Sequence, residues 1–222
     1  MKKFALFLVM ALTIPAIATA AKKSKMKTFN DVYIYAQSSR NTKIKGSATS
    51  LSTGITKGLE AASTDPKDID VMLYYGKVDH SKTKFFTLFS PGNPTLDIDW
   101  EKEGGTSPYC KFEGKSDDPD AFYALKNWKK RNDTKLEKLD GIDFDAATAE
   151  QISGLTVADS YWAKDVKVGD VILFEMSQNS YEAGAKGLIK IVAIEDDPDP
   201  KRAEKKGQGQ YQRINMSIKF VK

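Results

Sequence analysis

Residues 187–194 read Gly-Leu-Ile-Lys-Ile-Val-Ala-Ile, and residues 214–220 read Ile-Asn-Met-Ser-Ile-Lys-Phe. The first stretch is a nearly unbroken apolar run. The second alternates apolar with polar residues, as a strand with one buried face does, so Asn215, Ser217 and Lys219 are expected to face water. Residues 196–210 between them hold two prolines, two glycines and many charged or amide side chains. Sequential strands separated only by a polar connection usually pair. We therefore predict an antiparallel hairpin of residues 187–194 with residues 211–221, joined by a long exposed loop.

Further strands are predicted where β-branched and aromatic residues cluster between turn residues. They lie at residues 31–36, 69–75, 84–89, 95–100, 109–112, 166–168 and 171–174. Residues 46–62 are rich in Ser, Thr and Gly, and their pattern permits a strand, a loop or a short helix.

Two helices are predicted in the middle of the chain. The first begins at Asp118-Pro119, where a capping side chain precedes a proline at the first helical position. The second covers residues 146–153, with Asp145 as its cap and Ile152 as its buried contact. The fold class is therefore α+β, predominantly antiparallel β and sandwich- or barrel-like, with one or two helices inserted near residues 118–154.

The composition is that of a globular protein. Of the 222 residues, 41% are hydrophobic and 10% are aromatic, and there is one cysteine. A disordered chain would lack the aromatic residues, and a disulfide-rich scaffold would need many cysteines. Both classes are excluded.

Residues 1–20 have the three regions of a secretory signal peptide: a positive start, an apolar run at residues 4–18, and the small-x-small sequence Ala18-Thr19-Ala20. A membrane-spanning helix needs about 20 apolar residues, whereas this run is shorter and contains Pro15. We therefore predict cleavage before Ala21, no membrane span after cleavage, and a periplasmic or secreted product.

After the signal peptide, we predict a flexible basic leader at residues 21–29 and a single β-rich domain at residues 30–222. Beyond the leader, Lys and Arg are interleaved with Asp and Glu, and the formal net charge of the full chain is only +4. A nucleic-acid-binding protein would carry a clustered basic face. Nucleic acid is therefore not expected as a partner.

The usual catalytic residue types are scarce. His80 is the only histidine and Cys110 is the only cysteine, which excludes zinc sites with several imidazoles or a cluster of thiolates. Ser-His-Asp and Cys-His catalysis need a histidine beside the nucleophile, and His80 lies in the polar connection Asp79-His80-Ser81-Lys82, where we interpret it as an exposed loop residue. No phosphate-binding glycine loop occurs. The acid-rich segments 117–120 and 196–199 lack the spacing of a calcium loop, and helix capping and a solvated hairpin explain them. No catalytic residue, cofactor or metal ligand is predicted.

Carboxylate chemistry remains open, because glycoside hydrolysis needs only a pair of acids. Five acids lie in or beside predicted strands: Asp68, Asp70, Asp97, Asp99 and Glu101. Asp70 interrupts an apolar strand, and strand alternation is expected to turn it outward. If it faced inward it would need a partner.

Three aromatic residues are candidates for ligand binding, because exposed rings can stack on sugar rings: Trp100, Tyr161 and Trp162. Packing in the core is the alternative role for them. The favoured hypothesis is an exported, non-enzymatic binding or cell-envelope-associated module that takes a carbohydrate or an envelope protein. The alternative is a small secreted, glycan-directed hydrolase that uses paired carboxylates. Exposed aromatic residues on a sheet face would favour the binder, and a cleft with two facing carboxylates of shifted pKa would favour the enzyme.

Several short motifs carry a resemblance. They are Asp68-Ile69-Asp70, Ser90-Pro91, Val168-Gly169-Asp170-Val171 with Phe174, Lys186-Gly187-Leu188-Ile189-Lys190-Ile191 and Ile218-Lys219. Over roughly residues 68–222, the chain resembles a broad group of exported proteins of unknown function in Bacteroidetes-like bacteria. Many of those proteins are lipid-anchored, and this chain lacks their anchor cysteine. The resemblance implies export and a β-rich core and implies no activity.

Overall fold

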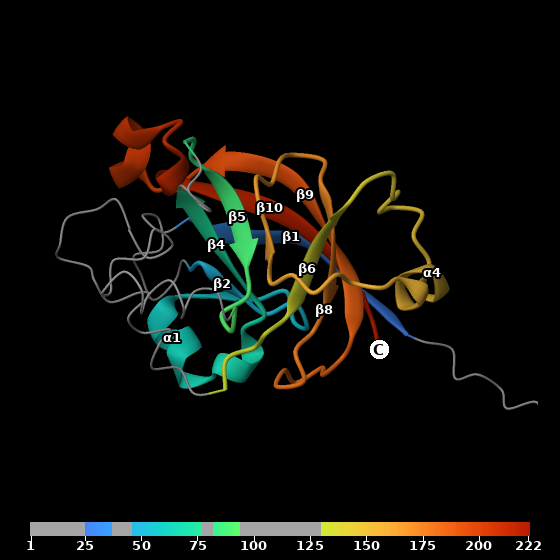
Figure 1. Ribbon diagram of the computed structural model, residues 1–222. Helices are drawn as coiled ribbons and strands as arrows, with labels where there is room; N and C mark the ends of the chain where they lie inside the picture. Colours follow the sequence, from blue (N-terminus) through green and yellow to red (C-terminus); the bar gives the residue numbers. More distant parts are fainter. Residues whose placement is uncertain (1–24, 37–45, 77–81, 94–129) are drawn as a thin grey trace, which may run out of the picture.

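The computed structural model describes residues 25–36, 46–76, 82–93 and 130–222 (Figure 1). In these residues the strands form two five-stranded antiparallel sheets. The predicted antiparallel, β-rich fold is confirmed. Several predicted features lie outside the described residues: the strands at 95–100 and 109–112, the helix starting at Asp118, and the side chains of His80, Trp100 and Cys110.

The first sheet holds the long strands. Its order is β1 (Met26–Tyr35), β10 (Gln212–Val221), β9 (Lys186–Asp196), β8 (Val171–Glu175) and β6 (Lys135–Leu139). The second sheet has the order β3 (Thr56–Lys57), β2 (Ala48–Thr49), β4 (Val71–Gly76), β5 (Phe85–Phe89) and β7 (Trp162–Ala163). The first and last strands of the described chain are therefore neighbours.

The predicted hairpin is confirmed. β9 pairs antiparallel with β10, and Ile189 stands opposite Ile218. The connection is not entirely a loop, since it contains the 3₁₀ turns η2 (Pro200–Lys205) and η3 (Gly209–Tyr211). β1 begins at Met26, which pairs with Val221, so the strand includes the end of the segment predicted as a leader.

Helical segments are short. They are α1 (Leu59–Thr64), η1 (Pro66–Asp68) and α4 (Ala149–Gly154). The predicted helix at residues 146–153 starts later than expected, and its cap is Thr148 rather than Asp145. The Thr148 hydroxyl accepts a hydrogen bond from the Gln151 amide at 3.2 Å, and the Gln151 side chain accepts one from the Thr148 amide at 2.9 Å. This reciprocal capping box satisfies two amides at once, which a cap at Asp145 would not do.

The main core fills the space between the two sheets. It consists of inward-facing apolar residues from both, among them Ile34, Leu73, Leu88, Ile189, Ile214 and Phe220. Backbone contacts join the sheets at two seams. The Leu136 amide donates to the Ser160 carbonyl at 2.7 Å, and the Tyr35 amide donates to the Gly46 carbonyl at 3.0 Å. The two sheets therefore form a sandwich, and backbone hydrogen bonds connect them at two places.

A second, smaller core covers one end of the outer face of the first sheet. Phe144 and Ile152 pack there on Leu173, Leu188 and Val221. This cover corrects the expectation that every polar residue of β10 faces water. Lys219 is buried, and its ammonium group donates to the carbonyls of Phe144 and Asp145 at 2.8 and 2.9 Å. Alternation identified the outer face correctly but could not show that a loop lies on it.

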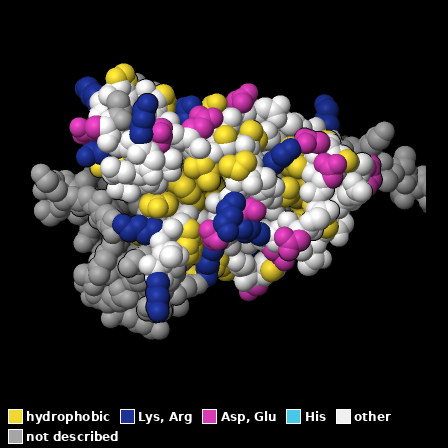
Figure 2. All heavy atoms as spheres, turned by 90° about the horizontal axis from the view of Figure 1, so that it is seen from above, with side chains coloured by type: hydrophobic (Ala, Val, Ile, Leu, Met, Phe, Trp, Pro, Cys, Tyr) yellow, Lys and Arg dark blue, Asp and Glu magenta, His cyan; other side chains and the backbone are white. Residues whose placement is uncertain are grey.

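The surface seen from above carries hydrophobic side chains across its middle, with charged side chains of both signs around them (Figure 2). Val168 and Val192 are exposed and lie on neighbouring segments, because the Gly169 amide donates to the Ile191 carbonyl at 2.9 Å. None of the helices in the described segments is long and apolar enough to cross a membrane.

Candidate functional site

The end of the first sheet's outer face that lies away from α4 carries a row of large polar and aromatic side chains. Tyr35 stands opposite Arg213 on β10, which in turn stands opposite Glu195 on β9. Two residues along each strand, Tyr33 stands opposite Asn215. Residues that alternate along a strand share a face, so these five side chains lie on the same side of the sheet. We call them the outer-face ladder.

Arg213 is the centre of the outer-face ladder. Its guanidinium carbon lies 3.9 Å from the centroid of the Tyr33 ring and 5.8 Å from that of the Tyr35 ring. One terminal nitrogen donates to the Tyr35 hydroxyl at 3.1 Å. Nε and the other terminal nitrogen donate to a single oxygen of Glu195 at 3.0 and 2.7 Å. The guanidinium group is therefore held in place by three side chains, those of Tyr33, Tyr35 and Glu195.

The contacts of Arg213 keep its guanidinium group positively charged. Partial burial works to lower the pKa of Arg213, but the hydrogen bonds from its guanidinium to Tyr35 and Glu195 outweigh burial and raise that pKa. Arg213 thus stays cationic, and its side chain keeps 18% of its surface exposed. Both tyrosines are half-buried, so part of each ring is also open.

Asn215 adds hydrogen-bonding capacity next to the rings. Its Nδ2 makes long contacts of 3.4 Å to the Tyr33 hydroxyl and to Asp31. Its Oδ1 is buried and, within the described part of the chain, accepts no hydrogen bond. A buried amide oxygen without a donor is unfavourable. A ligand hydroxyl that reached it would remove this cost.

The aromatic residues proposed from sequence lie elsewhere. Trp162, on β7, stands opposite Phe89, and the Lys164 ammonium group lies 3.9 Å from its ring centroid. The Tyr161 hydroxyl contacts Asp159 at 3.3 Å. Consecutive residues of an extended strand point to opposite faces, so Tyr161 and Trp162 do not form one common surface. Trp100 lies outside the described residues.

Sequence reasoning missed the ladder, although part of its signal was present. The strand predicted at residues 31–36 places Tyr33 and Tyr35 two residues apart and therefore on one face. The partner strand and its register were unknown. Only the pairing of β1 with β10 brings Arg213 between these two rings.

Asp70 was predicted to face outward, and this was wrong. It is only 1% exposed. Its Oδ2 accepts a hydrogen bond from the Leu51 amide at 2.9 Å, and its Oδ1 accepts from Ser180 at 3.0 Å and from Asn132 at 3.1 Å. Asp70 precedes β4, where its own amide donates to the Thr49 carbonyl, so strand alternation does not apply to it. Burial raises the pKa of Asp70 to about 7, and the hydrogen bonds from Leu51 and Ser180 oppose this rise.

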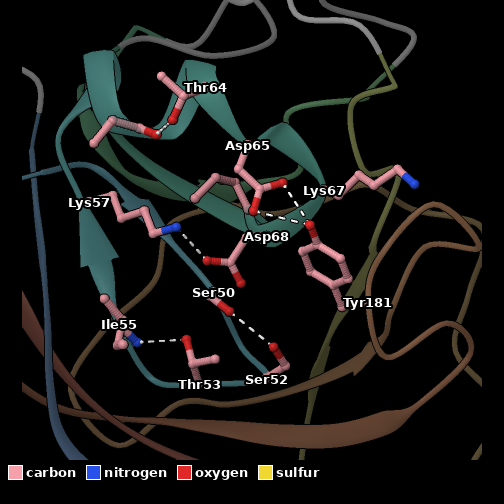
Figure 3. A network of polar contacts seen from close by, with 12 residues as sticks. Ser50, Ser52, Thr53, Ile55, Lys57, Thr64, Asp65, Lys67, Asp68 and Tyr181 are labelled. Carbon is pink, nitrogen blue, oxygen red and sulfur yellow. Dashed lines mark hydrogen bonds and ion pairs between the residues drawn. The ribbon is translucent and has the colours of Figure 1, made fainter.

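The residues just before Asp70 form a polar network with a second loop (Figure 3). The Tyr181 hydroxyl lies 3.2 Å from both carboxylate oxygens of Asp65. The Lys57 ammonium group pairs with Asp68 at 2.6 Å. The side chains of Tyr181 and Lys57, which come from two different parts of the chain, thus hold residues 65–68.

This arrangement does not suit a catalytic carboxylate pair. Asp68 is already paired with Lys57, and Asp70 is enclosed by its donors. Two hollows lie beside α4, one next to Ser153 and Lys186 and one next to Ile142 and Glu150, and neither is lined by Asp68 or Asp70. Asp97, Asp99 and Glu101 lie outside the described residues.

Acidic side chains of the β9–β10 connection accept hydrogen bonds from backbone amides of the same connection. Asp196 accepts hydrogen bonds from the Gly207 amide at 2.8 Å and from the Gln212 side chain at 3.1 Å, and Asp199 accepts one from the Lys201 amide. Within the described ranges, no group of three or more His, Cys, Asp or Glu side chains is placed to hold a metal ion.

Comparison with known proteins gives one structural neighbour. No protein-family model and no curated protein matches the sequence. A solved structure of a DUF4466 family protein from Parabacteroides merdae is similar, with a TM-score of 0.49 and 12% identity, over 90% of this chain and 54% of that chain. This chain therefore spans about half the length of that protein. The description of that structure names a family and no activity.

Proposed function

We propose that this protein is an exported, non-enzymatic binding module of the cell envelope, and that its ligand binds on the outer-face ladder. The observation that carries the proposal is the fixed guanidinium of Arg213 between Tyr33 and Tyr35 on the outer face of the sheet, where part of its side chain stays exposed. Rigid aromatic rings with a few placed polar groups are the usual make-up of a binding surface.

The chemistry of the ladder fits a glycan. Partly open tyrosine rings offer apolar surface to the C–H face of a sugar, and Arg213 and Glu195 offer a donor and an acceptor for its hydroxyl groups. Because Arg213 is already held by Glu195 and Tyr35, a ligand would meet it in a fixed position, which reduces the entropy lost on binding.

Titration calorimetry of residues 21–222 against polysaccharides and cell-wall fragments tests the proposal. Replacing Arg213 by Ala should weaken binding by about tenfold or more, since truncation of a central arginine commonly costs over 1 kcal/mol. Tyr181→Ala is the matched control for Tyr35→Ala, because Tyr181 is exposed and lies on a different loop. Equal binding by Arg213→Ala, Tyr35→Ala and the wild type would exclude the ladder as the binding site.

Product analysis in the same screen tests the alternative, a glycan-directed hydrolase. Turnover that disappears in Asp70→Asn or Asp99→Asn would replace the binding proposal with hydrolysis. Turnover that survives both changes would exclude Asp70 and Asp99 as the catalytic carboxylates.

Export is tested separately. We expect the protein recovered from the periplasm or medium to begin at Ala21, as its intact mass would show. Retention of residues 1–20 in a membrane fraction would contradict the signal-peptide assignment.

A further inference from the structure

A groove of about 470 Å³ lies between the loop of residues 141–147 and helix α4, at the covered end of the first sheet. Its apolar lining comes from Ile142, Ala146, Ala147, Ile152, Leu155 and Leu188. Ile152 and Leu188 are fully buried and form its floor, while Ile142, Ala147 and Leu155 are half-buried and keep apolar surface open to the groove. Its volume lies within the usual range of ligand sites, roughly 300–1,000 Å³.

The rim of the groove is acidic. Asp143 on the loop and Glu150 on α4 are both exposed. None of the described residues that line the groove is a lysine or an arginine. A ligand that fits this surface must therefore combine an apolar part with positive charge.

The nearby lysines do not neutralise this rim, because each is committed to another group. Lys190 pairs with Asp145 at 2.7 Å, and the Lys186 ammonium group donates to the Leu155 carbonyl at 2.7 Å. Lys219 donates to backbone carbonyls under the loop. These contacts hold the loop and the end of α4 against the sheet.

Both walls of the groove are also fixed from within. Asp143 Oδ1 accepts hydrogen bonds from the amides of Asp145 at 2.9 Å and Ala146 at 3.3 Å, which shapes the loop. Thr148 and Gln151 cap α4 at its start. The groove is therefore a formed feature of the fold, and an occupant would not have to order either wall.

We propose that this groove docks a short basic segment of another protein. One apolar side chain of the segment lies over Ile142, Ala147 and Leu155, and its lysine or arginine side chains reach Asp143 and Glu150. Charge complementarity favours a basic segment, because the carboxylates of Asp143 and Glu150 repel an acidic segment and find no charged partner in an uncharged one. The site is independent of the outer-face ladder, which lies at the other end of the strands.

Fluorescence anisotropy tests the proposal with the full mature protein. The ligand is a labelled short peptide in which leucine and alanine alternate with lysine, and the control peptide carries glutamate in place of lysine. We expect binding of the lysine peptide only, with an affinity that falls as salt is added. Binding of both peptides, or of neither, would overturn the proposal.

Variants locate the site. Ala146 is exposed and lines the groove, so Ala146→Trp should fill it, weaken peptide binding at least tenfold and leave the melting temperature unchanged. Glu150→Lys should weaken binding similarly, whereas Glu204→Lys makes the same charge change on an exposed side chain of η2 and should not. Equal losses in both lysine variants would show non-specific attraction to the net charge. Unaltered binding by Ala146→Trp would show that the peptide binds elsewhere.

Discussion

The hydroxyl of Ser180 donates a hydrogen bond to Asp70 Oδ1 over 3.0 Å and so connects two loops that are 110 residues apart in sequence. Ser180 follows β8 of the first sheet, and Asp70 precedes β4 of the second. Their contact lies in a buried polar cluster that also includes Asn132 and the Leu51 amide. Such a cluster stabilises one relative position of the elements it joins, because breaking it leaves buried polar groups without partners.

Asp70 should make the stability of the protein fall as pH rises. The pKa of Asp70 is raised by burial from 3.8 to about 7, so the folded protein keeps a proton that the unfolded chain releases. This contribution is complete below pH 3.8 and is lost, at about 1.4 kcal/mol per pH unit, until the pH reaches about 7. Urea unfolding of the wild type and of Asp70→Asn at several pH values measures it.

The variant serves as the comparison because its amide does not titrate. We take the free energy of unfolding of Asp70→Asn minus that of the wild type. This difference should increase between about pH 4 and about pH 7 and should stay constant above that pH. Parallel curves across this interval would show that Asp70 is ionised throughout.

Asn132 should matter far more than a second asparagine nearby. Its Nδ2 donates to the carbonyls of Lys67 and Ile69 at 2.8 and 2.9 Å and to Asp70. Asn132→Ala leaves these buried acceptors without their donor, and we expect a loss of about 2–4 kcal/mol in the free energy of unfolding. Asn179→Ala removes one exposed contact of 3.3 Å and should cost under about 1 kcal/mol. Similar melting temperatures for the two variants would contradict this assignment.

Adjacent residues of β9 should respond in opposite ways to a new charge. Ile191 is fully buried between the sheets, whereas Val192 is 41% exposed at a register shift. Ile191→Asp buries an unpaired carboxylate and should cost on the order of 4 kcal/mol or more. Val192→Asp should change stability by about 1 kcal/mol at most. Chemical denaturation of both proteins measures the contrast, and a large loss in Val192→Asp would show that this residue is covered.

Gly187 should tolerate no side chain. A Cβ atom there would lie 2.2 Å from the Lys219 carbonyl oxygen and 2.3 Å from the ring of Phe174. We expect Gly187→Ala to cost several kcal/mol, as overpacking against backbone does. Gly154→Ala is the control: it meets no atom within 4 Å, and alanine favours the helical conformation at the end of α4. Thermal melting should show a large loss for the first change and a small gain for the second.

The sequence predicted the fold class and the β9–β10 hairpin, because both depend on local hydrophobic periodicity. It also located α4 and its buried residue Ile152, although not its cap. Hydrophobic alternation reports which face of a strand is apolar and does not report what lies on the other face. Asn215 and Lys219 were therefore expected in water and are buried.

The candidate site was harder to predict, for a physical reason. Arg213 meets Tyr33 and Tyr35 through pairing between strands at opposite ends of the chain, and no local pattern encodes that register. The position of Asp70 likewise depends on Asn132 and Ser180, each more than sixty residues away. The spacing of residues along the sequence does not predict such long-range contacts.

The central position of β10 between β1 and β9 determines when this chain can finish folding. β1 is the first of the described strands in the sequence, and its partner β10 is the last of them. Until β10 has formed, β1 and β9 each have an open edge and the apolar face of the first sheet is incomplete. Loss of β10 by proteolysis would separate the two strands that it joins.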